Sequence, residues 1–460
     1  MTRFLYGLIL LTGLTVAQPV DLIVTARHVV TMDAARRVID HGAIAITGSK
    51  IVAVGPASEI AAKHPARQRL ERPNALLAPG LINTHCHAPM VLLRGIADDL
   101  NLQDWLEKYI FPAEAKNVSV EFVRWGTRLA VWEMLRGGTT TYADMYYFEE
   151  VVAEETKRAG MRGVLGETVI RFPVADAKTP REALARTEAF LQKYKDDPLI
   201  IPAVAPHAPY TNSDETLRAC RRLADKYKVP LITHLSETKR ENDDAIKERN
   251  MSPTHRLEML GFFDGPTLVA HGVWLDDADI AILAKRGVGV AHNPSSNMKL
   301  ASGVAPVLKL LAAGVAVGLG TDGPAGSNND LNLFEEMDLA GKLQKVSSGD
   351  PKSLPAEQIF AMATTLGAKA LGLQGKIGSL EAGKLADFIT VDLEGAHALP
   401  MFNVYSQLVY ALKASDVRDV GVNGRLVVRD RNMLTLDPTS IRAKTMEIRQ
   451  KVVESIGTRK

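Results

Sequence analysis

Short apolar strands and amphipathic helices alternate along the middle of the chain, from about residue 77 to residue 375. Apolar runs bounded by glycine and polar positions predict strands in this part of the chain. The clearest strand candidates are Gly163–Glu167, Ile200–Ala205, Leu231–His234, Thr267–His271, Gly289–His292 and Ala316–Gly320. Helices such as Arg181–Lys195 and Asp214–Tyr227 lie between them. Strict alternation implies parallel strands, and a segment of about 300 residues fits a (β/α)8 barrel.

Both ends of the chain have a different pattern, in which short β-rich runs are separated by tight turns. Ala43–Ile46 and Lys50–Gly55 are typical of residues 19–77. A matching pattern returns in residues 377–435, at Ala386–Asp392 and around the Asn423-Gly424 turn. We therefore predict a small β-sandwich domain built from both termini, a barrel over residues 78–376, and a C-terminal helix over residues 436–460.

The first 18 residues have the layout of a secretory signal peptide. Arg3 precedes an apolar run from Phe4 to Val16, and small residues lead to a cleavage site near Ala17. A membrane span needs about 20 apolar residues, so this run is short for one. A first strand or a retained anchor is the alternative. Removal of the leader predicts a periplasmic or secreted protein with no membrane span, whereas an unprocessed leader predicts a cytoplasmic protein.

The charge balance excludes one class of partner. The formal net charge is +2 at pH 7, and the chain has no long basic run. Binding to nucleic acid requires a clustered basic face, so no nucleic acid is expected. A small-molecule substrate is expected instead, and the sequence leaves a homo-oligomer open.

The strongest chemical signal is the run from Pro79 to His87, which ends in His85-Cys86-His87. On a strand, residues two apart point to the same face, so both imidazoles point one way and Cys86 points the other. Two such imidazoles at the end of a first barrel strand can bind one metal ion together. Cys220 lies on a predicted helix, and both cysteines are expected to be buried free thiols.

Further histidines and one acid follow the other predicted strands. They are His207, His234, His271, His292 and Asp322. In barrels, polar residues at the carboxyl ends of strands line the active-site mouth, whereas residues lower on the strands pack the core. Any single histidine of this kind is often only a buried structural residue, but the recurrence at successive strand ends favours a common site.

At these residues the chain resembles the amidohydrolase superfamily, and specifically the 5-methylthioadenosine/S-adenosylhomocysteine deaminases. The likeness covers roughly residues 21–428. The matching stretches are Gly80–Gly95, Asp104–Lys116, Gly137–Asp144, His207–Tyr210, His234–Glu237, His292–Leu300 and Gly320–Met337. The leader departs from the family pattern, because those enzymes are usually cytoplasmic.

The resemblance implies a metal site and its composition. The implied ligands are His85, His87, His234 and Asp322. Three imidazoles and a carboxylate suit Zn²⁺, with Fe²⁺ or Mn²⁺ also compatible. Relatives with two metals use a lysine on the fourth strand, and Ile200–Pro209 contains none. One divalent metal ion is therefore expected.

The resemblance also implies catalytic and substrate-binding roles. Glu237, three residues after His234, is expected to be the general acid, and His271 and Asp322 are expected to orient water and accept its proton. The substrate-binding residues implied are Glu114, His207, Arg171, Arg181 and Trp105. Glu114 is expected to bind ribose hydroxyls, and the arginines a carboxylate on the substrate.

These residues predict a hydrolytic deaminase acting on the adenine ring of S-adenosylhomocysteine, 5'-methylthioadenosine or a related adenosine nucleoside. A guanine- or pterin-type deaminase and a triazine-type chlorohydrolase keep the same fold with another substrate. A catalytically inactive binding barrel is the third reading, which the complete histidine set disfavours.

Overall fold

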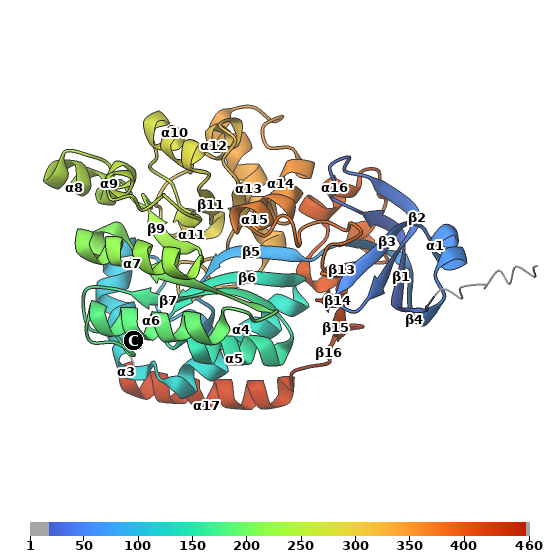
Figure 1. Cartoon of the computed structure of the whole chain (residues 1–460), viewed down its shortest axis with the longest axis horizontal. Coiled ribbons are helices and arrows are strands. Elements are labelled where there is room, and N and C mark those ends of the chain that lie inside the picture. The colour runs from blue at the N-terminus through green and yellow to red at the C-terminus, as the bar shows by residue number, and fades with distance from the viewer. Residues whose placement is uncertain (1–17, 457–460) are drawn as a thin grey trace, which may run out of the picture.

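The computed structural model describes residues 18–456, so most of the predicted leader lies outside the described residues. Two sheets organise the chain (Figure 1). The larger body is the barrel, and the second sheet lies beside it, with the first strands of the chain farthest from the barrel. Within the described residues, no helix has both the length and the apolar character needed to span a membrane.

The barrel consists of eight parallel strands joined in sequence order. They are β5 (Leu81–Cys86), β6 (Thr139–Tyr146), β7 (Arg162–Val169), β8 (Ile200–Pro206), β9 (Leu231–Leu235), β10 (Thr267–His271), β11 (Gly289–His292) and β12 (Val317–Leu319). A parallel bridge between Cys86 and Asp322 joins the two edge strands. The backbone N–H groups of Thr321 and Asp322 both donate to the His85 carbonyl, at 3.1 and 3.0 Å. This joint confirms the predicted barrel.

Helices surround the barrel; they connect consecutive strands, except that the last three named below follow β12. They are α4 (Val120–Arg136), α5 (Glu149–Ala159), α6 (Pro180–Tyr194), α7 (Asp214–Tyr227), α8 (Lys239–Arg249), α9 (Pro253–Met259), α10 (Asp277–Arg286), α11 (Pro294–Lys299), α12 (Val307–Ala312), α13 (Leu333–Ser348), α14 (Ala356–Met362) and α15 (Thr365–Ala370). Side-chain caps begin many of them: Ser119, Thr179, Ser213 and Thr238 each accept a backbone N–H in the first turn. The long connection after β5 adds η1 (Ala88–Leu93), α2 (Leu102–Trp105), η2 (Leu106–Ile110) and α3 (Phe111–Asn117).

The second sheet combines strands from both ends of the chain, as predicted. Its strands are β1 (Val20–Val30), β2 (Val38–Thr47), β3 (Lys50–Pro56), β4 (Ala66–Pro79), β13 (Phe388–Asp392), β14 (Val417–Val422), β15 (Arg425–Arg429) and β16 (Asn432–Met433). All eight form one continuous ladder in the order β16-β15-β14-β13-β4-β1-β2-β3. The antiparallel pairing of β4 with β13 joins the two terminal segments.

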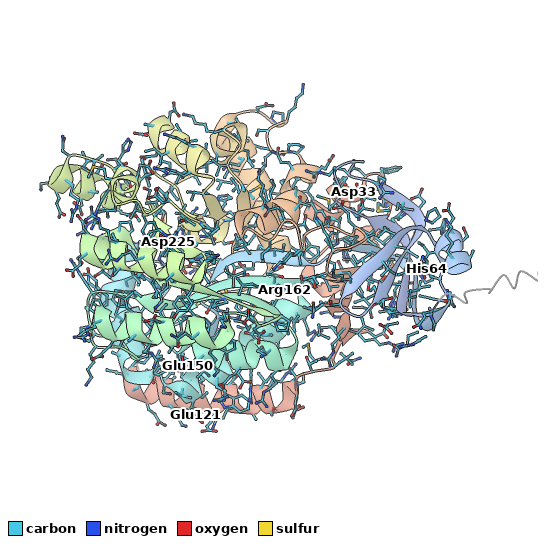
Figure 2. The ribbon with its side chains drawn as sticks, in the orientation of Figure 1. Asp33, His64, Glu121, Glu150, Arg162 and Asp225 are labelled. Carbon is cyan, nitrogen blue, oxygen red and sulfur yellow. The ribbon has the colours of Figure 1, made fainter. Side chains whose placement is uncertain are left out.

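Two contacts attach the flanking elements to the barrel. Arg162 at the start of β7 donates to the Asp387 carboxylate beside β13, and Figure 2 shows Arg162 between the two bodies. The helix α17 (Pro438–Ile456) runs along α3 and α4 (Figure 1). Asn117 at the end of α3 donates to the Ser455 hydroxyl at 2.8 Å. The C-terminal helix therefore supports the connection that follows β5.

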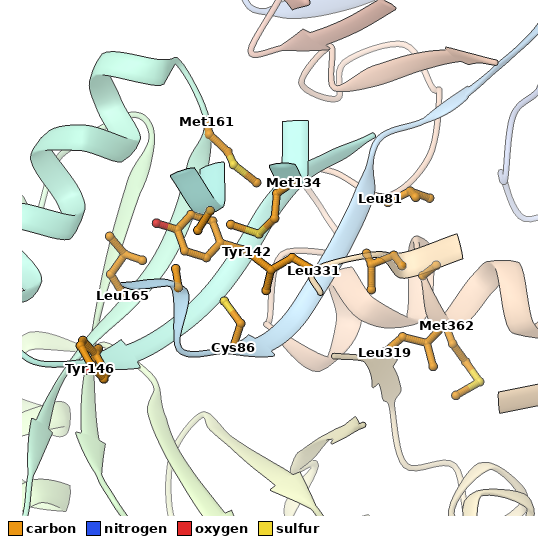
Figure 3. Close-up of a cluster of buried hydrophobic side chains, with 14 of the residues drawn as sticks. Leu81, Cys86, Met134, Tyr142, Tyr146, Met161, Leu165, Leu319, Leu331 and Met362 are labelled. Carbon is orange, nitrogen blue, oxygen red and sulfur yellow. The ribbon is translucent and has the colours of Figure 1, made fainter. Parts of the chain in front are cut away.

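The two cysteines are buried free thiols, as predicted. Cys86 points into an apolar cluster with Tyr142 and Leu331 on the outer side of β5 (Figure 3). Burial raises the pKa of Cys220 to about 12, which keeps that thiol protonated and unreactive. Neither sulfur takes part in the chemistry described below.

Candidate active site

The predicted metal ligands converge at the carboxyl ends of three strands. His85 is the last residue but one of β5 and His87 follows that strand, His234 lies on β9, and Asp322 follows β12. One candidate ligand atom from each of the four lies within 4.8 Å of the others. The strand ladder stops at Cys86, so His87 is not on the strand as the sequence suggested, but it still joins the group from the cap of η1.

Distances within this group leave room for one central ion. The Nε2 atoms of His87 and His234 are 3.3 Å apart. Asp322 Oδ1 lies 3.4 Å from His85 Nε2 and 3.3 Å from His87 Nε2. His85 and Asp322 are almost completely buried. Four lone-pair atoms this close together repel one another unless a proton or a cation lies between them.

Hydrogen bonds behind the ligands fix which nitrogen faces the centre. The Nδ1–H of His87 donates to the Met145 carbonyl, and the Nδ1–H of His234 donates to the His207 carbonyl, both at 2.7 Å. Each Nε2 lone pair therefore points inward, as in metal-bound imidazoles. His85 Nε2 has no hydrogen-bond partner among the described residues. This orphaned buried atom and the N3O donor set fit one zinc-type ion.

Beside the ligands lie the two groups predicted to move protons. Glu237 Oε2 is 3.7 Å from His271 Nε2, and both side chains are buried. The Nδ1–H of His271 donates to Asn297 Oδ1 at 3.0 Å, so Nε2 is the free acceptor. Burial raises the pKa of Glu237 well above its ordinary value, and the nearby Asp322 and Glu241 carboxylates raise it further. Burial therefore favours the protonated form of Glu237, which is the form that a general acid requires.

Three residues that shape this site have a left-handed backbone, although none is glycine. The φ angles are +50° at Ser236, +77° at His271 and +61° at Asp322. Such conformations cost of order 1–3 kcal/mol each and collect at functional sites. Ala270 faces the barrel interior. Alternation along the strand would therefore turn the His271 ring away from the interior. The left-handed backbone at His271 breaks this alternation, so its ring also lies at the mouth of the barrel.

A cavity with an empty volume of about 570 Å³ opens over these groups. Its apolar wall comes largely from the connection after β5, with Leu102, Trp105 and Phe111, and from Tyr147. An apolar and aromatic lining around a few polar groups is typical of a small-molecule site. A larger outer cavity of about 1360 Å³ shares five lining residues with it, including His207 and Tyr210, so the two are continuous.

Glu114 lies in the inner cavity wall, on α3, and is buried. The Tyr146 hydroxyl donates to Glu114 Oε1 at 2.6 Å. Burial raises the pKa of Glu114 to about 7, although the Tyr146 hydrogen bond acts in the opposite direction. The carboxyl therefore changes charge near neutral pH.

The structure brings most of the predicted substrate-binding residues to the cavities. His207 lines both cavities, and burial lowers its pKa to about 3, so its ring is neutral. Trp105 lines the inner cavity and donates to the Ala325 carbonyl at 3.0 Å. Arg171 lines the outer cavity. Arg181 is exposed on the first turn of α6 and lines neither cavity.

His292 belongs to the predicted strand-end set but does not line the cavity. Ala291 faces the barrel interior, so the next side chain points outward into the helical layer. The ring is fully buried, and burial lowers its pKa to about 3. It is therefore a neutral structural residue.

Sequence reasoning missed several residues that hold the site together. Ser296 donates its hydroxyl hydrogen to Asp322 Oδ2 at 2.6 Å, Asn297 orients His271, and Tyr146 binds Glu114. The first two lie within the stretch His292–Leu300, which matched the family without suggesting a role for them.

The geometry defines a class of protein. It is a (β/α)8-barrel enzyme whose active site, at the carboxyl ends of the strands, is built from residues that can hold one metal ion.

Comparison with known proteins places this enzyme in a family. The model of the amidohydrolase family matches residues 76–427, and that of the bacterial imidazolonepropionase-like composite domain matches residues 42–66. A 5-methylthioadenosine/S-adenosylhomocysteine deaminase from Syntrophobacter fumaroxidans is 50% identical over 418 residues, which are 91% of this chain and 95% of the relative. A 5'-deoxyadenosine deaminase from Methanosarcina barkeri is 43% identical over 442 residues, covering 95% and 99% of the two chains.

A solved structure agrees with these relatives. The crystal structure of an adenosine deaminase from Xanthomonas campestris, with bound zinc, has a TM-score of 0.93 and 40% sequence identity. It covers 95% of this chain and 99% of its own. The present chain belongs to the amidohydrolase family and is a hydrolase.

Proposed function

We propose that the enzyme is a hydrolytic deaminase that removes the exocyclic amine from the adenine ring of S-adenosylhomocysteine, 5'-methylthioadenosine or a related adenosine nucleoside. The observation that carries this proposal is the buried Glu237 carboxyl beside His271, at the edge of the inner cavity. Deamination of an aminopurine requires a proton donor to a ring nitrogen and a base for water, and this pair offers both. The names of the similar proteins support the same substrate class.

The metal we propose is a single zinc ion held by His85, His87, His234 and Asp322. When bound there, it would supply a nucleophile by lowering the pKa of water toward neutrality. The bound zinc in the Xanthomonas campestris structure supports this choice, and Fe²⁺ or Mn²⁺ remains compatible with the donor set.

The proton transfers are assigned to three side chains of the protein. Protonated Glu237 donates to the ring nitrogen beside the amine-bearing carbon, which makes that carbon electrophilic. His271, through its free Nε2, and Asp322 accept the proton that the attacking water loses. That proton then reaches the amine, which leaves as ammonia. The ring carbon becomes a carbonyl when the added hydroxyl gives its own proton to the Glu237 carboxylate, which restores the acid.

The remaining contacts are assigned to the nucleoside. Ionised Glu114 accepts hydrogen bonds from the ribose hydroxyls, His207 contacts the purine or sugar, and Trp105 closes the apolar wall. A 5' substituent extends into the outer cavity, where Arg171 can bind a carboxylate. We leave Arg181 out of this assignment because it is exposed on α6.

A panel of aminopurine nucleosides, assayed for ammonia release by the zinc-loaded enzyme, tests the function. Adenosine, 5'-methylthioadenosine and S-adenosylhomocysteine should release ammonia, and guanosine should not. Ammonia from guanine or from pterins, or chloride from a chlorotriazine, with no ammonia from any adenosine nucleoside, would replace this proposal with one of those activities.

We also propose that residues 1–18 direct export. N-terminal sequencing of the protein from its native cells should find a mature chain that begins near Gln18. An intact leader on the native protein would refute this.

A further inference from the structure

The proton donor Glu237 lies in a short turn between a strand and a helix. The strand β9 ends at Leu235, and α8 begins at Lys239 (Figure 1). Ser236 has the left-handed backbone described above, and the Glu237 side chain has one oxygen, Oε1, without a hydrogen-bond partner among the described residues. Oε1 therefore adds nothing to fixing where the Glu237 carboxyl points.

The carboxylate of Glu241 holds this turn from one side. Its Oε1 accepts the backbone N–H of Ser236 at 3.1 Å, and its Oε2 accepts the backbone N–H of Glu237 at 2.8 Å. Glu241 is the third residue of α8, and its own N–H donates to the Thr238 hydroxyl at 3.2 Å. A glutamate at this position commonly reaches back to the capping residue. Here both oxygens reach further, to the two residues before the cap.

The other side of the turn is held by the segment after β10. The Ser236 carbonyl accepts the backbone N–H groups of Val273 and Trp274, both at 2.9 Å. Asn242, the neighbour of Glu241, donates to the Trp274 carbonyl at 2.5 Å. The strained turn is thus fixed at its N–H groups by Glu241 and at its carbonyl by the segment that follows His271. The two catalytic side chains, Glu237 and His271, are held in one frame.

We propose that Glu241 is a positioning residue for the deamination assigned above: it holds the Ser236–Glu237 backbone so that the Glu237 carboxyl faces His271 and the cavity. This proposal rests on the proposed function. Two observations agree with it. A strained backbone persists only where several surrounding contacts hold it in place. The two bonds from the consecutive N–H groups to the Glu241 carboxylate are contacts of this kind. The Glu241 carboxylate also raises the pKa of Glu237, after the larger effect of burial.

The test compares Glu241→Ala and Glu241→Gln in the zinc-loaded enzyme, with adenosine as substrate. A misplaced catalytic group costs on the order of 10- to 100-fold in rate, so kcat of Glu241→Ala should fall by that factor. KM and the zinc content should stay near the wild-type values. Glu241→Gln keeps one acceptor oxygen, so it should recover part of the lost rate. Asp243→Asn, an equal charge change at an exposed position of α8, is the matched control and should keep the wild-type kcat.

The second arm places each substitution in a Glu237→Gln background. If Glu241 acts through Glu237, the further loss of kcat there should be less than about two-fold. An equal fold-loss in both backgrounds, or wild-type kcat in Glu241→Ala, would overturn the proposal. If Glu241→Ala does not fold, Glu241→Gln in the two backgrounds decides by the same criteria.

The outcome is distinguishable from failure of the proposed function. If the wild-type enzyme releases no ammonia from any nucleoside, the function is wrong, and the positioning role is then tested by crystallography. A zinc-loaded Glu241→Gln structure should show the Glu237 carboxyl displaced from His271. An unchanged Glu237 carboxyl in that structure would refute the positioning role by itself.

Discussion

Removing the Tyr146 hydroxyl should weaken nucleoside binding only over a limited range of pH. Tyr146 donates to Glu114 at 2.6 Å, and both side chains are buried. This bond favours the ionised form of Glu114, which is the form proposed above to accept hydrogen bonds from ribose hydroxyls. Tyr146→Phe removes the bond and leaves the aromatic ring, so the cavity wall keeps its shape.

The magnitude follows from the strength of a hydrogen bond to a charged group. Such a bond contributes about 1.5–3 kcal/mol, and one pKa unit corresponds to about 1.36 kcal/mol. The pKa of Glu114 should therefore rise from about 7 to about 8–9. For the middle of that range, a pKa of about 8.5, the ionised fraction at pH 7.5 should fall from about three-quarters to about a tenth, so KM should rise about 8-fold.

Ammonia release at a series of adenosine concentrations, from pH 6.5 to pH 9.5, measures this effect. The KM of the wild-type enzyme should fall as pH rises through about 7, because Glu114 loses its proton there. The KM of Tyr146→Phe should approach the wild-type value at the alkaline end of the range, where Glu114 is ionised in both enzymes. Tyr147→Phe, which removes the neighbouring hydroxyl but leaves the Tyr146 bond in place, is the control. A rise in KM that stays constant across this pH range would refute the reasoning.

Three further changes test the metal site and the proton donor. His85→Ala should lose zinc and activity together, as metal analysis and the ammonia assay will show; full activity in metal-free protein would contradict the mechanism. Glu237→Gln should retain equimolar zinc but lose about 10²- to 10⁴-fold in kcat, the usual contribution of a general acid. Ser296→Ala removes the 2.6 Å hydrogen bond to Asp322, so competition with a chelator should show zinc bound about 10- to 100-fold more weakly. An unchanged zinc affinity would mean that Asp322 is held by other contacts.

The sequence predicted those parts of the molecule that depend on local pattern. Alternating strands and helices predicted the barrel. The short β-rich runs at both ends of the chain predicted the second sheet. The histidines at strand ends predicted the metal cluster because parallel strands bring their carboxyl ends to one side. His292 shows the limit of this reasoning. It ends a strand like the others, but alternation along β11 turns its ring into the helical layer.

Contacts between distant segments and unusual backbone angles could not be predicted from the sequence. Tyr146 meets Glu114 across 32 positions, and Ser296 meets Asp322 across 26. The left-handed backbone at His271 places its ring in the mouth, and no glycine marks that position. The contacts of Glu241 are local, but the capping rule predicts a bond to Thr238 rather than to the two residues before it.

The residues that close the barrel also supply most of the predicted metal site. Three of the four ligands lie on the joint between the first and last strands, where the His85 carbonyl accepts the N–H groups of Thr321 and Asp322. Asn83 adds to this joint, because its side chain donates to the Thr321 hydroxyl at 2.8 Å. The joint holds His85 and Asp322 together through backbone hydrogen bonds that involve no metal. The fourth ligand, His234, comes from the opposite part of the sheet, and an ion bound to all four therefore ties the joint to β9. Since β9 leads directly into the turn of Glu237, the same ion would also fix the proposed proton donor relative to β5 and β12.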